Sequence, residues 1–169
     1  TQFGYKEGEQ MQSETINDAI SITWKTDINL LLAFNETFSL IKWRSSLGLL
    51  VKSALNQIDE HSVIQLLFGH ETVELTITKN KQLLLAKCFE FNAIEDICYH
   101  LLNGCRQLNI SPSEVLVKVQ GLVENNSPLL ESVKRYFLNV ELDETDTNGW
   151  SEQFNQIPSH YFTSLITTK

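Results

Sequence analysis

Three strand patterns that follow one another directly constrain the fold of this chain most. Residues 63–68 form an almost uninterrupted apolar run, which is typical of a strand covered on both faces. Residues 73–78 alternate between apolar and polar side chains, which predicts a strand with one face toward water. A third strand pattern runs from Leu83 to about Phe89, and both connections are short enough to be hairpin turns. Together these segments predict a three-stranded antiparallel meander.

The sequence after this meander predicts a helix, a strand, a second helix and a short last strand. An unbroken apolar stripe extends from Ile94 to Leu108, and Asn92 is placed as its N-cap. Alternate valines in residues 115–119 indicate a strand, Ser127 is placed to cap the next helix, and residues 140–142 indicate the last strand. The order βββαβα predicts an α/β fold, a mixed sheet with flanking helices of the actin-like ATPase or ribonuclease H-like kind.

The N-terminal third gives weaker patterns. Residues 1–17 are polar and have no clear period, so we expect a loose terminus or an exposed loop. Residues 20–24 predict a short strand, and Asp27 can cap the helix that follows it. Residues 40–43 predict a second short strand, and residues 46–58 predict an amphipathic helix. This part of the chain is therefore expected to have the order β-α-β-α.

The same order of elements occurs again from Val115 to the end of the chain, which suggests an internal duplication. We interpret residues 1–60 as a partial first actin-like subdomain and residues 61–169 as a complete second one. A chance echo of the element order is the alternative. Because Thr1 is not an initiator methionine, we also expect the sequence to be a processed form or a fragment.

Several stretches, most of them in the second part of the chain, carry a family resemblance. They are residues 73–77 through 83–85, residues 89–91 leading into 95–102, Ser127-Pro128-Leu129 with Arg135-Tyr136, and residues 158–162. These stretches resemble a bacterial family of unknown function that has an actin-like ATPase fold, whose members look longer at the N-terminus. The resemblance covers roughly Asp27 to the end. It implies the fold and no particular activity, because the family has none established.

The first hairpin turn is where the resemblance would place phosphate and Mg²⁺. Such a site needs a carboxylate for the metal, and bare backbone and a hydroxyl for phosphate oxygens. Gly69 and Thr72 fit as a weak remnant of cofactor binding, but Leu67 stands where the carboxylate is needed, and Gly121 has no glycine neighbours for an adenosine loop. We expect no cofactor, no metal and no ATP hydrolysis, with a degenerate nucleotide-binding protein as the alternative. Nuclease activity is not expected either, because residues 63–68 contain no carboxylate.

The charge balance narrows the range of partners. The formal net charge is −8, with 21 acidic against 13 basic residues, which repels nucleic acid and anionic membranes. No apolar run reaches the ~20 residues of a membrane span, and no signal peptide opens the chain. The 3 cysteines show no paired spacing, which argues against a disulfide framework. We expect a cytoplasmic protein with a protein partner, and a homodimer is left open.

Two segments near the C-terminus are candidate sites. Residues 144–149 place oxygen ligands at alternate positions, as in a calcium loop, but Asn155 replaces the last ligand and a solvated acidic turn is preferred. His160, Tyr161 and Phe162 form an aromatic segment that is a candidate docking surface, although we prefer the interpretation that it packs the last element onto the sheet.

No catalytic residue can be named from the sequence. The hypothesis we prefer is a non-catalytic protein-interaction or assembly module. A small-molecule enzyme whose site lies in a missing N-terminal half is a third option.

Overall fold

The chain divides into two compact units, the first ending at Gly48 and the second beginning at Leu49. The computed structural model describes residues 8–38, 40–57, 61–148, 150–154 and 156–166. We expected a boundary after residue 60, and the structure divides the chain earlier, within the helix of residues 46–56. Most of this helix belongs to the second unit, and its Leu50 and Val51 are fully buried. In the described part of the chain, no helix has the length and apolar character needed to cross a membrane.

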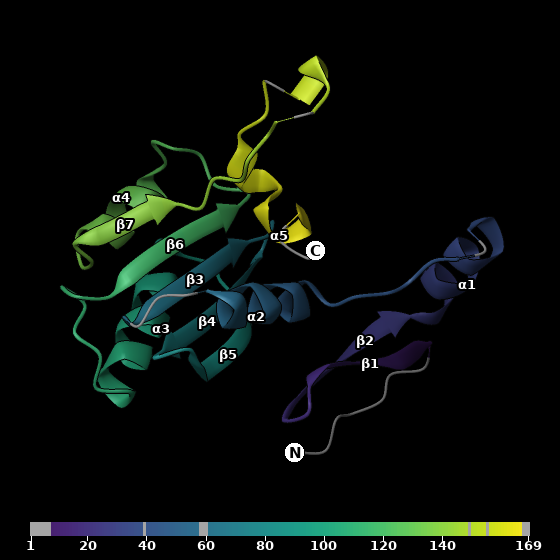
Figure 1. Ribbon diagram of the computed structural model, residues 1–169, viewed down its shortest axis with the longest axis horizontal. Helices are drawn as coiled ribbons and strands as arrows, with labels where there is room; N and C mark the ends of the chain where they lie inside the picture. The colour runs from purple at the N-terminus through teal and green to yellow at the C-terminus, as the bar shows by residue number, and fades with distance from the viewer. Residues whose placement is uncertain (1–7, 39, 58–60, 149, 155, 167–169) are drawn as a thin grey trace. The chain divides into compact units, whose positions relative to one another are not determined.

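A five-stranded mixed sheet forms the centre of the second unit (Figure 1). Its strands are β3 (Val63–Phe68), β4 (Thr72–Lys79), β5 (Gln82–Glu90), β6 (Leu116–Gly121) and β7 (Asn139–Leu142), in the order β5-β4-β3-β6-β7. β4 pairs antiparallel with both β3 and β5, whereas β6 pairs parallel with β3 and β7 pairs parallel with β6. The predicted meander and its union with the valine-rich strand in one sheet are confirmed.

One face of this sheet packs against α3 (Ile94–Gln107) and α4 (Pro128–Lys134) (Figure 1). The side chains between these layers are apolar and include Leu66, Ile97 and Phe137, each at most 1 % exposed. Removing such side chains from water stabilises the fold by about 25 cal/mol per Å² of apolar surface. This layer is the hydrophobic core of the second unit.

Side chains close in sequence cap these two helices. The Ser127 hydroxyl accepts a hydrogen bond from the backbone N–H of Leu130, as predicted. The prediction for α3 is wrong in detail, because its N-cap residue is Ala93 and not Asn92. The Asp96 carboxylate accepts from the backbone N–H groups of Asn92 and Ala93 at 3.1 Å. The acidic side chain in the first turn thus accepts hydrogen bonds from the backbone N–H groups at the start of the helix, because alanine has no side-chain acceptor for a cap.

The opposite face of the sheet is covered by α2 (Ser46–Asn56) and by the C-terminal elements η2 (Ser159–Tyr161) and α5 (Thr163–Ile166) (Figure 1). The expectation that one face of β4 is wet is therefore wrong, since Thr76 and Thr78 are only 1 % and 5 % exposed. The helix that covers this face precedes the sheet in sequence, so the alternation within β4 does not reveal it. The expected end of that helix, Ile58, lies outside the described residues.

The first unit contains the hairpin of β1 (Glu9–Asn17) and β2 (Ile20–Asp27), followed by α1 (Ile28–Thr37). The Asp27 carboxylate caps α1 through the N–H groups of Asn29 and Leu30, as predicted. Residues 9–17 were expected to be loose, and this prediction is wrong, because they pair with β2 along its length. Residues 1–7 of the same segment lie outside the described part of the chain.

The strand expected at residues 40–43 is absent, because Leu40 lies in a turn and residues 41–45 have no regular structure. A short strand persists only where a neighbouring strand satisfies its backbone groups, and no such pairing is made here. The β-α-β-α order that suggested a duplication is therefore broken in the first unit.

Candidate functional site

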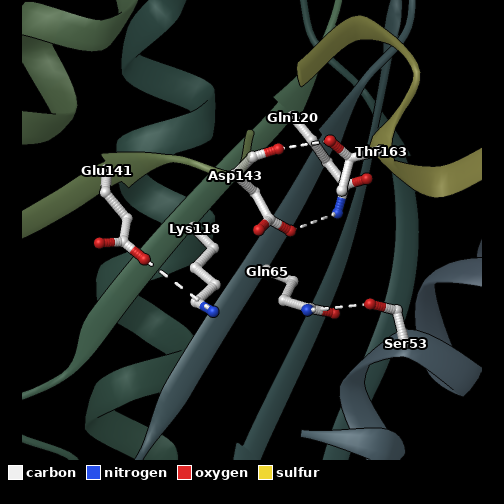
Figure 2. A network of polar contacts seen from close by, with 7 residues as sticks. All are labelled: Ser53, Gln65, Lys118, Gln120, Glu141, Asp143 and Thr163. Atoms are coloured by element: carbon white, nitrogen blue, oxygen red, sulfur yellow. Dashed lines mark hydrogen bonds and ion pairs between the residues drawn. The ribbon is translucent and has the colours of Figure 1, made fainter. Parts of the chain in front are cut away.

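Polar side chains lie on the sheet face that α2 covers. Gln65 on β3, Thr76 on β4 and Gln120 on β6 are each at most 1 % exposed. The Gln65 amide donates to the Ser53 hydroxyl of α2 at 3.4 Å (Figure 2), and its oxygen accepts from the Thr76 hydroxyl at 3.5 Å. Uncharged polar groups can be buried in this way because they bond to one another. These contacts join α2 to two neighbouring strands.

Leu67, Gln120 and Asp143 form one row across the carboxyl ends of the three parallel strands. Leu67 is the register partner of Gln120. The backbone N–H of Asp143 donates to the Val119 carbonyl at 2.8 Å, which extends the pairing of β6 and β7 by one residue. The Gln120 amide in turn donates to the Asp143 carboxylate at 3.4 Å (Figure 2). Because open α/β sheets bind ligands at this edge, the row is the candidate functional site.

The C-terminal segment covers this row with side chains of the protein itself. The Thr163 hydroxyl at the start of α5 donates to the backbone carbonyl of Asp143 (Figure 2). His160 in η2 is 2 % exposed, and its Nε2 lies 2.8 Å from the carbonyl oxygen of Val123. Gln120 is left with no exposed surface. The edge of the sheet is thus closed by η2 and α5.

Burial affects both polar side chains of this row, the Asp143 carboxyl and the Gln120 amide. Burial raises the pKa of the Asp143 carboxyl, and Glu141 adds to the rise, whereas Lys118 opposes it. The Lys118 ammonium also lies 3.9 Å from the Glu141 carboxylate (Figure 2). Within the described residues, the buried Oε1 of Gln120 has no hydrogen-bond partner.

Gly69 and Thr72, the expected remnant of a phosphate site, lie together in the hairpin between β3 and β4. The backbone N–H of Gly69 donates to the Thr72 carbonyl at 2.9 Å. A Cβ atom at Gly69 would stand only 2.9 Å from the Thr72 hydroxyl oxygen. Both residues thus take part in the contacts of the turn itself.

Gly121 at the end of β6 also has a structural explanation. Its φ angle is +86°, and a Cβ atom there would lie 2.3 Å from the Phe68 carbonyl oxygen. The next residue, Leu122, donates its N–H to that same carbonyl at 2.8 Å. Only glycine permits this close approach of β6 to the end of β3.

The three residues proposed as a partner surface separate in the structure. His160 is buried, which removes it from any docking surface, and Tyr161 is half-buried beside it. Phe162 instead contacts the rings of Trp150 and Phe154. The rings of Trp150, Phe154 and Phe162 and the side chain of Leu165 form a partly exposed group. We call this group the aromatic cluster.

Sequence reasoning missed the polar row and the two other rings of the aromatic cluster. A weak signal was present, because Gln65 and Gln120 interrupt strands that are otherwise apolar. No sequence pattern links either glutamine to Asp143, since that link depends on the strand order.

Metal-binding geometry is not apparent in the part of the chain that is described, where no three His, Cys, Asp or Glu side chains gather. In the calcium-like segment, the Asp146 carboxylate accepts from the backbone N–H of Asn148, which is an ordinary turn contact. Gly149 and Asn155 of that segment lie outside the described residues.

Comparisons with known proteins address the fold and the family. No match was found among curated proteins. The structure is similar to the crystal structure of a Bacteroides thetaiotaomicron protein described as having an actin-like ATPase fold and unknown function, with a TM-score of 0.76 and 19% sequence identity. The match covers 99% of this chain and 62% of that one, so this chain spans less than two thirds of that protein. The predicted actin-like ATPase fold is confirmed.

The family assignment rests on the sequence itself. The model of a family described as "Protein of unknown function (DUF3822)" matches residues 5–140, which is most of the chain. The resemblance to a family of unknown function is thereby confirmed, and the chain belongs to this family.

Proposed function

We propose that this protein acts as a non-catalytic protein-interaction or assembly module. The observation that carries the proposal is the aromatic cluster, in which Phe154 and Leu165 are 44 % and 63 % exposed. Large apolar side chains that gather on a surface are typical of protein-binding sites, whereas single exposed ones are common everywhere.

The closed edge of the sheet supports the non-catalytic part of the proposal. Leu67 contributes an apolar side chain where a metal-binding carboxylate would be needed, and Thr163 and His160 cover the neighbouring positions. Gly121 has a structural explanation, and Gly69 and Thr72 bond to each other within their own turn. No observation thus favours the alternative of a degenerate nucleotide site that uses Gly69 and Thr72.

The first unit offers a second exposed apolar surface. On α1, Leu30, Leu32 and Phe34 are each more than 40 % exposed, and Leu31 is its one buried residue. A two-stranded sheet with one helix buries little apolar surface and is marginal by itself. A partner that covered this helix would stabilise the unit.

Comparative capture from a native lysate tests the proposal. The full chain is used as bait beside its Phe154→Ser variant and a Leu138→Ser control, in which another exposed apolar side chain is removed. We expect one reproducible partner protein for the wild type and the control. The absence of any reproducible partner for all three baits would count against the proposal.

A thermal-shift measurement with ATP and Mg²⁺ tests the non-catalytic part. We expect no change in Tm, because a ligand stabilises a protein only when it binds the folded state. A concentration-dependent rise in Tm would favour the nucleotide-binding alternative.

A further inference from the structure

An apolar hollow lies beside the aromatic cluster near the C-terminus. Trp150, Phe154, Phe162 and Leu165 line it, together with Ser151, and its volume is about 410 Å³. This volume is in the range of sites that hold a large side chain or a small ligand. The lining comes from η1 (Glu152–Phe154), from α5 and from the segments beside them.

The three rings hold one another in fixed positions. Their centroids are 5.5 to 5.9 Å apart and the ring planes meet at 78° to 85°, so each pair is packed edge to face. Each such contact stabilises the cluster beyond the burial of surface. A rigid cluster loses little side-chain entropy when a partner binds.

The lining of the hollow decides which kind of occupant fits. Three rings and Leu165 make up most of this lining, with Ser151 beside them. The free space is the apolar hollow at their side, which suits an aliphatic or aromatic side chain.

The stretch of chain that supplies Trp150 and Phe154 is acidic. Glu144, Asp146 and Glu152 are exposed and lie in the same stretch of chain as Trp150 and Phe154. Between Arg135 and Lys169 the sequence contains no lysine or arginine. A second copy of this chain would bring the same acidic stretch to the interface, and like charges would oppose that contact. Basic groups would complement it.

We propose that this hollow binds a partner segment with one large apolar side chain flanked by lysine or arginine residues. The apolar side chain enters the hollow, and the basic residues lie over Glu144, Asp146 and Glu152. This inference rests on the proposed interaction function and specifies the partner and the surface. We expect the apolar contact to supply most of the affinity for the partner segment. We expect binding to weaken as the salt concentration rises, because salt screens the charges.

Fluorescence anisotropy with three labelled synthetic peptides tests the inference on the full chain. The first peptide is a basic helix with leucine and tryptophan on one face, the second replaces those apolar residues by alanine, and the third replaces every lysine by glutamate. We expect the first peptide to bind at least tenfold more tightly than the other two, and its binding to weaken as salt rises. Equal binding of the first two peptides, or binding of the acidic one, would overturn the inference.

Three protein variants and one control variant locate the site. Phe154→Ser and Leu165→Ser should each weaken binding of the first peptide at least fivefold, whereas the Leu138→Ser control should leave it unchanged. Circular dichroism shows whether each variant is folded, and Glu152→Lys, which leaves the hollow intact, should weaken binding by about threefold. If the first peptide binds all of these variants as tightly as the wild type, the hollow is not its binding site.

The capture experiment and light scattering separate this inference from the proposed function. A partner that Phe154→Ser still captures would leave the interaction function standing and overturn this site. A concentration-dependent dimer that Phe154→Ser abolishes would identify a second copy as the occupant and overturn the basic partner. The loss of every partner, with the peptide result intact, would count against the proposed function alone.

Discussion

The imidazole of His160 bonds to the backbone carbonyl of Val123 across 37 residues of sequence, with Nε2 and the oxygen 2.8 Å apart. The side chain is 2 % exposed, so no water replaces this bond if it is lost. The contact fastens η2 to the segment that follows β6. It places in the interior a residue that was also a candidate for a docking surface.

Replacing this side chain should therefore destabilise the second unit. His160→Ala leaves the Val123 carbonyl without its donor and creates a cavity, and we expect a loss of about 3 kcal/mol in the free energy of unfolding. Urea denaturation followed by circular dichroism measures the change. His70→Ala is the control, because that side chain is 90% exposed, and it should change stability by less than about 0.5 kcal/mol. Equal effects of the two substitutions would contradict the structural role of His160.

Gly121 should be far less tolerant of a methyl group than Gly104 on α3. Gly121→Ala combines a positive φ with a contact to backbone, and we expect a loss of about 3 kcal/mol or more. At Gly104 the new methyl group would meet the end of the flexible Ile77 side chain at 3.0 Å. The gain in helix propensity of about 1 kcal/mol offsets that contact. Thermal unfolding of the two variants checks the contrast, which a similar Tm for both would refute.

The stability of the fold should carry a pH dependence from Asp143. Burial raises the pKa of this carboxyl in the folded protein above its ordinary value of 3.8, so the folded state holds the proton more tightly than the unfolded chain. Its contribution to stability is full below that ordinary value and is lost as the pH rises through the folded pKa. Asp143→Asn, which mimics the protonated form, should be more stable than the wild type at pH 7, with a difference that shrinks toward pH 4.

Denaturant titrations of both proteins from about pH 3.5 to 8 measure this difference. Asp146→Asn makes the same chemical change on an exposed side chain and serves as the control. A wild type that is more stable than Asp143→Asn at neutral pH would show that the charge of Asp143 is compensated.

The cysteines should differ in reactivity toward a thiol reagent such as Ellman's reagent. Cys98 and Cys105 are buried, and burial raises the pKa of Cys105 to about 11. Cys88 is exposed, although partial burial and the charges of Glu74 and Glu90 raise its pKa also. We expect slow modification of Cys88 in the native protein at pH 8, and of all 3 thiols in denaturant. Fast native modification of more than one thiol would show that α3 opens readily.

The hairpin between β4 and β5 should gain stability from one substitution. Asn80 and Lys81 have φ angles of 51° and 62°, which is the conformation of a two-residue turn that favours Asn-Gly. Lys81→Gly should stabilise the second unit by about 0.5–1 kcal/mol, because it relieves a strained residue. Lys79→Gly, placed in β4, should instead be destabilising, and chemical denaturation distinguishes the two. If Lys81→Gly lowers the stability, contacts of the lysine side chain stabilise the hairpin by more than the backbone strain destabilises it.

Local patterns in the sequence were enough to predict the meander, the long helix after it, and the caps at Asp27 and Ser127. Each of these depends on contacts within a few residues: alternation of side chains along a strand, a turn of fixed length, or an oxygen next to free N–H groups. Such contacts form from neighbours in the chain and leave a readable pattern.

Local patterns do not predict that Thr76 is buried, that His160 faces inward, or that Gln120 contacts Asp143. These outcomes depend on which distant segment covers a given face: α2 comes before the sheet, and η2 returns to it after β7. A glutamine or histidine is polar in either setting, so its local pattern does not distinguish water from a buried partner. The free energy that separates the two settings comes from burial and from bonds between residues far apart in sequence.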